Sequence, residues 1–288
     1  MAVTRNGIIE IFFETFGDDA DPAMLLINGL GSQCISYEDE FCDRIAAFGY
    51  FVIRFDNRDV GLSSRWDEAQ GANLEAAGGV SGDAPYSLSD MANDAVAVLD
   101  ALGIERAHVM GLSMGGMIVQ AMAIDHPERF ITLTSVMSTT GDVDVGQASE
   151  EALKVLLSPM PTDREGAIAL QLAGARTWGS PDAYDVTRIT EHTNRALDRS
   201  PKTAGVGRQM KAILTSGSRS EGLSTSQIPT LVLHGSNDTL VNHSGGVRTA
   251  EVIPGARLVT IEGMGHDLAP NYWDRVIALL TEHASRHR

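Results

Sequence analysis

The sequence from Met110 to Gly116 reads Met-Gly-Leu-Ser-Met-Gly-Gly, so Ser113 has a glycine two positions before it and another two positions after it. An apolar run with the character of a buried strand precedes this stretch, and an apolar helical pattern follows it. In a tight turn from strand to helix, such glycines remove Cβ atoms that would clash, and the turn holds the serine hydroxyl clear of the sheet. Free N–H groups at the start of the helix favour negative charge beside that hydroxyl. The pattern therefore predicts that Ser113 is a nucleophile.

A serine hydroxyl is a poor nucleophile at neutral pH and needs a base within hydrogen-bond reach. His266 follows the apolar run Arg257–Ile261 in a glycine-containing loop, which predicts an imidazole at a sheet edge. His234 closes another predicted strand and is the rival candidate. The remaining histidines lie within a strand, at a helix end or in polar and terminal segments, and they are His108, His126, His192, His243, His283 and His287. We therefore predict that His266 is the base.

The base needs an acid that orients it. Asp238 follows the run Thr230–His234 at its carboxyl end, where α/β sheets place their sites. Asp142 and Asp144, which come after the run Ile131–Met137, are alternatives for the same role. We predict that Asp238 is the acid.

The three candidates follow one another along the chain in the order nucleophile, acid, base, and each comes after a different predicted strand. That order is much more specific than any of the single motifs. In such a set the serine attacks a carbonyl carbon, the histidine accepts the serine proton, and the aspartate holds the histidine in the right tautomer. We therefore expect Ser113, Asp238 and His266 to meet at one edge of a sheet.

The elements that would position these residues alternate along the chain. Short β-branched or apolar runs are separated by longer helical patterns, which is typical of a mostly parallel central sheet flanked by helices, an α/β fold. Several runs are apolar almost throughout, as strands buried on both faces are. The runs predicted as strands are Ile8–Phe16, Ala23–Ile27, Tyr50–Phe55, Ala107–Met110, Ile131–Met137, Thr230–His234 and Arg257–Ile261.

Two helices are clear from their patterns. Ser87 and Asp90 resemble a capping box, and Gly103 follows the helical run as a stop signal. The apolar face of that run consists of Leu88, Met91, Ala92, Ala95, Val96, Leu99 and Leu102. A second amphipathic pattern begins just after Pro270 and predicts a C-terminal helix.

The region from Gly141 to Ser226 breaks the alternation. It contains helical patterns such as Glu150–Leu157 and Glu165–Ala173 but no convincing buried strand. We therefore predict a core of residues 1–140 and 227–288, with residues 141–226 inserted between late strands as a helical cap over Ser113. Long insertions of this kind usually carry function. Trp178 would line the pocket or pack within the cap.

Composition narrows the class of protein. The chain has 288 residues, 43% of them hydrophobic and 21% charged, which is ordinary globular composition. Its 22 basic against 38 acidic residues give a net charge of −16, which disfavours binding to nucleic acid or to anionic membrane surfaces. No run of about 18 apolar residues is present, and no apolar signal core follows the N-terminus. We expect a cytoplasmic protein, and a homo-oligomer is compatible with the sequence.

The two cysteines, Cys34 and Cys42, are too few for a disulfide framework or a structural zinc site. We interpret them as structural thiols. The charged residues Asp56, Arg58 and Asp59 are interpreted as an ion-pair network that holds a loop. The methionines around Ser113 are interpreted as core and acyl-pocket lining, and they are Met110, Met114, Met117 and Met122.

Three motifs together resemble a known family. The stretch Arg54–Ser63 reads R-x-D-x-R-D-x-G-x-S, the stretch Gly111–Gly115 reads G-L-S-M-G, and Ile253-Pro-Gly-Ala-Arg-Leu258 is followed by Glu262-Gly-Met-Gly-His266. Through them the chain resembles serine hydrolases of the α/β-hydrolase fold over essentially all of its length outside the insertion. Within that family it resembles the aclacinomycin methylesterases and the cofactor-free haloperoxidases.

The resemblance implies an oxyanion hole made by two backbone N–H groups, those of Met114 and Leu30. The family has histidine at the start of the second loop, where this chain has Asn28. That histidine is mainly a structural support, so we expect the hole to persist.

The resemblance also implies a carboxylic ester hydrolase that forms an acyl-enzyme and uses no metal or organic cofactor. The implied partner is a small hydrophobic ester, such as the methyl ester of a hydrophobic acid. A cofactor-free haloperoxidase or perhydrolase, a carbon–carbon bond hydrolase, and a ligand receptor with low turnover on the same fold are the alternatives. Serine at the turn argues against the dehalogenase and epoxide hydrolase branches, which use aspartate there.

Overall fold

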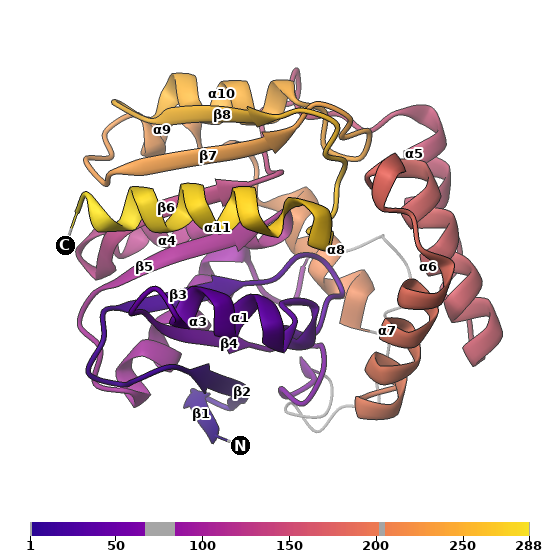
Figure 1. The fold of residues 1–288 in the computed structure, drawn as a ribbon, viewed down its shortest axis with the longest axis horizontal. Coiled ribbons are helices and arrows are strands. Elements are labelled where there is room, and N and C mark those ends of the chain that lie inside the picture. The colour runs from indigo at the N-terminus through magenta and orange to yellow at the C-terminus, as the bar shows by residue number, and fades with distance from the viewer. Residues whose placement is uncertain (1, 67–83, 202–204, 288) are drawn as a thin grey trace.

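The computed structural model describes residues 2–66, 84–201 and 205–287 (Figure 1). Their strands form one eight-stranded sheet in the order β1-β2-β4-β3-β5-β6-β7-β8. β1 and β2 pair antiparallel, β2 and β4 pair antiparallel, and all the other neighbours are parallel. The strands are β1 (Ala2–Asn6), β2 (Ile9–Phe16), β3 (Ala23–Ile27), β4 (Phe51–Phe55), β5 (Ala107–Leu112), β6 (Phe130–Val136), β7 (Thr230–Gly235) and β8 (Arg257–Ile261).

The predicted α/β fold class is therefore confirmed, and all seven predicted strands exist, with ends that differ from the predicted ones by at most two residues. β1 was not predicted. Its sequence Ala-Val-Thr-Arg-Asn is polar and mostly exposed because it lies at the edge of the sheet, so it lacks an apolar signal. β5 runs to Leu112, and it therefore delivers the chain directly to Ser113.

Helices cover both faces of the sheet. α1 (Asp39–Ala46) and α11 (Pro270–Ser285) pack on the face turned to the viewer in Figure 1 and share one apolar cluster with the sheet. α3 (Leu88–Ala101) and α4 (Met114–Asp125) contribute to the cluster on the other face, which also includes Ile253 after α10 (Ser244–Val252). The sheet is thus buried on both sides, as its apolar strands require.

The two helices expected from capping and proline signals are present. In α3 the Ser87 hydroxyl accepts the Asp90 N–H at 3.1 Å, and the Asp90 carboxylate accepts the Ser87 N–H at 2.8 Å. The capping box is therefore confirmed. α11 begins at Pro270, where the missing N–H of proline leaves no hydrogen bond unmade.

No strand lies among the described residues of the segment 141–226. Its α-helices there are α5 (Glu150–Leu156), α6 (Arg164–Trp178), α7 (Val186–Arg199), α8 (Gly205–Thr215) and α9 (Ser220–Leu223), and a short 3-10 helix spans Pro181–Ala183. α5, α6 and α7 lie together beyond one end of the sheet (Figure 1). The two ends of the segment meet, because the Arg219 N–H donates to the Thr140 carbonyl at 2.9 Å.

Two ion pairs join this segment to the loop that follows β4. Arg199 of α7 contacts the Asp56 carboxylate at 2.7 Å, and Arg208 of α8 makes two bonds to Asp59, at 2.8 and 2.7 Å. The Asp56 carboxylate also accepts the N–H of Cys34 and of Leu62. Both aspartates are buried, so their charges depend on these partners.

Arg58 lies in the same loop and makes a bidentate pair with Asp94 of α3, at 2.6 and 2.8 Å. All three charged residues of the loop are buried and paired. This arrangement agrees with a structural role for them.

Replacing Arg208 by methionine is expected to destabilise the protein by about 3–5 kcal/mol, because it leaves the buried Asp59 charge without its guanidinium partner. Urea denaturation would measure the loss. The double variant Arg208→Met with Asp59→Asn should recover part of that stability. Equal stability of the wild type and the single variant would contradict a structural ion pair.

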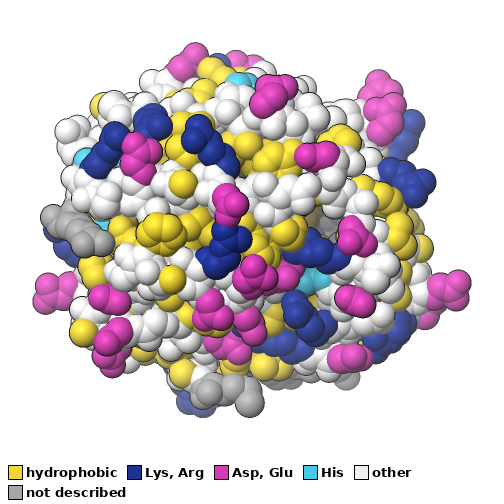
Figure 2. Space-filling view, in the orientation of Figure 1, with side chains coloured by type: hydrophobic (Ala, Val, Ile, Leu, Met, Phe, Trp, Pro, Cys, Tyr) yellow, Lys and Arg dark blue, Asp and Glu magenta, His cyan; other side chains and the backbone are white. Residues whose placement is uncertain are grey.

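Acidic side chains are spread over the face shown in Figure 2, among basic and apolar ones. No helix in the described part of the chain has the length and apolar character needed to cross a membrane. Cys34 and Cys42 are both free and buried. Burial raises the pKa of the Cys42 thiol to about 12, and burial together with Asp56 raises that of Cys34 far above its usual value, so neither forms a thiolate at neutral pH.

Candidate active site

Ser113 lies at the turn between β5 and α4 in a strained backbone conformation, with φ 53° and ψ −117°. A serine rarely adopts a positive φ, and such strain persists only where the surrounding structure enforces it. The turn is this tight because Gly115 lies against β3: a Cβ atom there would be 2.1 Å from the carbonyl oxygen of Ile27. Gly111 is under the same constraint, since its Cβ would be 2.2 Å from the Gly115 carbonyl oxygen. The glycines of the motif therefore set the position of the hydroxyl.

The structure brings the three predicted side chains together. His266 Nε2 lies 2.9 Å from Ser113 Oγ, although the two residues are 153 positions apart in the chain. On its other side, His266 Nδ1 lies 2.7 Å from Asp238 Oδ2. The His266 side chain is 7% exposed, so the chain of hydrogen bonds is largely shielded from water. In this geometry a proton can pass from the Ser113 hydroxyl to the His266 imidazole.

Asp238 is held by several donors besides His266. Its Oδ1 accepts the backbone N–H groups of Leu240 and Val241 at 2.9 and 2.8 Å. Burial by itself would raise the pKa of Asp238, but the charges and hydrogen bonds of His266 and His234 outweigh it and lower that pKa well below its usual value. Asp238 is therefore ionised at neutral pH and can stabilise a protonated imidazole.

His234, the rival base, lies behind the acid. Its Nε2 is 2.8 Å from the Val241 carbonyl oxygen and 3.3 Å from Asp238 Oδ2, and its side chain is fully buried. Because both neighbours of Nε2 are acceptors, that nitrogen carries the proton. Among the described residues no hydrogen bond joins His234 to Ser113. His108, one of the remaining histidines, is buried in β5 with Nδ1 2.9 Å from Thr132 Oγ1.

The two alternative acids lie in a different cluster. Asp142 accepts hydrogen bonds from Ser218 and Ser220 and pairs with Arg248 at 2.6 Å. The hydrogen bond from Ser218 is the main cause that lowers the pKa of Asp142 to about 2. Asp144 contacts Arg248 at 3.0 Å. The structure therefore brings Asp238, and neither alternative, to His266.

The two residues predicted to supply the oxyanion hole, Met114 and Leu30, lie in segments next to Ser113. Met114 is the first residue of α4, so its N–H has no acceptor one turn earlier in the helix. Leu30 follows Gly29, and a Cβ atom added to Gly29 would lie 3.3 Å from the Ser113 Cβ. The Asn28 side chain crosses this loop and donates to the Gln33 carbonyl at 3.1 Å. Asn28 therefore joins the start of this loop to Gln33.

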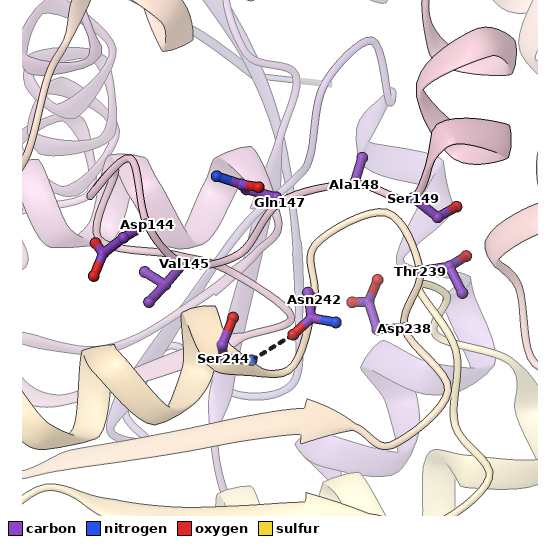
Figure 3. A pocket seen from close by; sticks show the side chains of 9 residues that line it. All are labelled: Asp144, Val145, Gln147, Ala148, Ser149, Asp238, Thr239, Asn242 and Ser244. Carbon is purple, nitrogen blue, oxygen red and sulfur yellow. Dashed lines mark hydrogen bonds between the residues drawn. The ribbon is translucent and has the colours of Figure 1, made fainter.

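A cavity of about 410 Å³ opens beside the acid, as Figure 3 shows. The residues that line it include Gln147 and Ser149 on one side and Asp238 and Asn242 on the other. Its lining does not include Ser113 or His266. Among the described residues, no group of three or more histidine, cysteine, aspartate or glutamate side chains could hold a metal ion.

The sequence did not identify the residues that support the His266 loop. The His266 N–H donates to the Trp178 carbonyl at 2.6 Å, and the Gly265 N–H donates to Ser180 Oγ at 2.9 Å. Ser180 also binds both carboxylate oxygens of Asp267, at 2.8 and 2.5 Å. The Trp178 ring packs against Gly174 of its own helix. These partners come from the segment 141–226, and no local pattern in the sequence connects them to His266.

The family and the relatives that the chain matches agree with the fold described above. Residues 22–270 match the family described as alpha/beta hydrolase fold. The chain is 31% identical to the rhodomycin D methylesterase DauP of Streptomyces sp. (strain C5), covering 96% of this chain and 95% of that protein. It is 32% identical to the rhodomycin D methylesterase DnrP of Streptomyces peucetius, covering 96% of each.

Among solved structures, the enol-lactonase from Burkholderia xenovorans LB400 is similar, with a TM-score of 0.74. The alignment has 21% sequence identity and covers 96% of this chain and 97% of the lactonase. At that identity the likeness concerns the fold alone.

Proposed function

The chain belongs to the alpha/beta hydrolase fold family, and from that premise we propose that it is a serine hydrolase that cleaves carboxylic esters. The observation that carries the proposal is the unbroken line from the Ser113 hydroxyl through His266 to Asp238, with contacts of 2.9 and 2.7 Å. Ser113 is the nucleophile in this proposal, His266 the general base, and Asp238 the acid that orients it.

In the first half of the reaction, Ser113 Oγ attacks the carbonyl carbon of the ester while His266 Nε2 accepts the serine proton. Asp238 stabilises the imidazolium that forms and keeps the proton on Nδ1. The tetrahedral intermediate then expels the alcohol, which takes its proton from His266, and the acyl group stays on Ser113. In the second half, water attacks the acyl-enzyme with His266 again as base, and the acid is released.

The negative charge of each tetrahedral intermediate develops on the former carbonyl oxygen. We assign its stabilisation to the backbone N–H groups of Met114, the residue after Ser113, and of Leu30 in the loop after β3. One such donor contributes about 3–4 kcal/mol to the transition state in hydrolases where it has been removed by mutation. The N-terminus of α4 adds a favourable dipole at the same place.

The proposed substrate is the methyl ester of a hydrophobic acid. Support comes from the two relatives at 31% and 32% identity, both named rhodomycin D methylesterases, over almost the whole chain. We also propose that residues 141–226 form a cap that shapes the substrate site, on a core of residues 1–140 and 227–288. The backbone contact from Trp178 to His266 supports that proposal. A cytoplasmic location stays a prediction.

A substrate panel tests the proposal. It consists of p-nitrophenyl esters of increasing acyl length and methyl esters of bulky polycyclic acids, rhodomycin D among them. We expect hydrolysis of both series, with higher kcat/KM for the bulky methyl esters once the uncatalysed rates are divided out. A fluorophosphonate should label the protein once, on the peptide that contains Ser113. Failure to hydrolyse any ester of the panel would contradict the proposed function.

A further inference from the structure

Gln209 of α8 is a wholly buried side chain that contacts the loop after β3. Its Oε1 accepts the Gly31 N–H at 2.8 Å, and its Nε2 donates to the Arg58 carbonyl oxygen at 2.8 Å. A buried carboxamide is costly unless both of its ends are hydrogen-bonded, and here both are. The bond to Gly31 joins residues that are 178 positions apart. Gln209 therefore connects the segment 141–226 to two loops of the sheet.

The packing around this bond is close. The Val206 side chain of α8 lies 3.0 Å from the position that a Cβ atom of Gly31 would occupy, and Gly31 has a φ of +68°. A larger residue at position 31 would be strained and would also push α8 away. The glycine therefore allows α8 to approach the backbone of this loop directly.

Gly31 is the residue after Leu30, whose N–H we assign to the oxyanion hole. Peptide units are planar, so only the two torsions of Leu30 separate the plane that carries the Leu30 N–H from the plane that carries the Gly31 N–H. Gln209 holds the peptide plane that carries the Gly31 N–H. The plane that carries the Leu30 N–H also contains the Gly29 carbonyl, which accepts the Ser32 N–H at 3.2 Å. A hydrogen bond on each of the two peptide planes that flank Leu30 therefore fixes the direction of the Leu30 N–H.

We infer that Gln209 is a positioning residue for the oxyanion hole, acting through Gly31 on the N–H group of Leu30. The inference rests on the proposed function and deepens it, because it makes α8 of the inserted segment part of the catalytic geometry. An oxyanion donor acts mainly in the transition state, so its misplacement lowers kcat and leaves KM nearly unchanged. Among the described residues no hydrogen bond joins Gln209 to His266 or Asp238, so the acid limb of the pH profile should stay in place.

The test compares three substitutions at position 209 by kcat per active site titrated with a fluorophosphonate. Gln209→Met removes both hydrogen bonds at nearly constant volume. We expect it to lower kcat by about 10- to 100-fold, since a misplacement of about 1 Å can reduce a rate 100-fold. Gln209→Glu keeps an oxygen that accepts the Gly31 N–H and should retain more activity than the methionine variant. If the methionine variant does not fold, Gln209→Asn replaces it, since its shorter carboxamide does not reach Gly31.

A boronic acid that forms a tetrahedral adduct on the serine provides the second readout. Its inhibition constant should rise by the same factor by which kcat falls, because both depend on the hole. The matched control is Gln120→Met, which removes another wholly buried glutamine, whose Oε1 accepts a hydrogen bond from Arg219 Nε at 3.0 Å. Its kcat should stay within twofold of the wild type.

A kcat within twofold of the wild type in the methionine or asparagine variant would overturn the inference. A fall in kcat with an unchanged boronate inhibition constant, or with a shifted acid limb, would overturn it as well. Failure of the proposed function looks different: the wild type would then hydrolyse no ester, or Ser113→Ala would hydrolyse esters as the wild type does.

Discussion

Ser113→Ala is expected to lower kcat for ester hydrolysis by about 10⁴- to 10⁶-fold, which corresponds to about 5–8 kcal/mol of transition-state stabilisation. Alanine removes only the hydroxyl oxygen, so the acyl-enzyme has no atom on which to form. Residual hydrolysis would come from the oxyanion hole and from substrate binding alone. Steady-state kinetics with a p-nitrophenyl ester and a methyl ester would measure the loss.

The fold should survive this substitution. Alanine has the same Cβ as serine, and it therefore carries the same strain at the φ of 53°. We expect a wild-type circular dichroism spectrum, an unchanged or raised Tm, and no labelling by the fluorophosphonate. Full esterase activity in a folded Ser113→Ala protein would refute the assignment of the nucleophile.

Asp238→Asn is expected to lower kcat by about 10⁴-fold, with little change in KM. The substitution preserves the shape of the side chain but places an amide opposite His266 Nδ1. The imidazole can then turn to the tautomer that carries its proton on Nε2, and that nitrogen no longer accepts the proton of Ser113. Steady-state rates across a range of pH would test this, because the loss should persist at every pH at which the enzyme is folded.

Asp142→Asn is the matched control for the acid. Asp142 follows the neighbouring strand β6 and was the alternative candidate, but its carboxylate contacts Ser218, Ser220 and Arg248. We expect its kcat to stay close to that of the wild type, with a loss of stability only. A large loss of kcat in Asp142→Asn together with an active Asp238→Asn would reverse the assignment.

The strands could be predicted because their signals are local. The run Ala23–Ile27 is apolar throughout, and Thr230–His234 is apolar at its three central positions, since both faces of a central parallel strand are buried. β1 escaped detection for the opposite reason: an edge strand with exposed side chains has no apolar pattern to reveal it. The start of α3 was readable because a capping box involves residues only three positions apart.

In the candidate site, too, some features could be predicted from local sequence patterns and others could not. The Ser113 turn could be predicted because its glycines, its strand and its helix are contiguous. The choice between Asp238 and Asp142 was less certain, because both follow a strand of the sheet and no local pattern says which carboxylate faces His266. The two-sided contact of Asp238 with His266 and His234 appeared only when the loops after β7 and β8 were packed together.

The fold class, the turn at Ser113 and the order of nucleophile, acid and base could be inferred from residue types and spacing, because each depends on neighbouring residues or on positions at strand ends. The hydrogen bonds from Gln209 to Gly31 and from the His266 N–H to Trp178 became visible only in the folded chain, as did the ion pairs of Arg199 and Arg208. Those contacts join residues of the segment 141–226 to loops far away in the chain. Their partners are chosen by how helices pack over the sheet, which no spacing of residue types along the chain specifies.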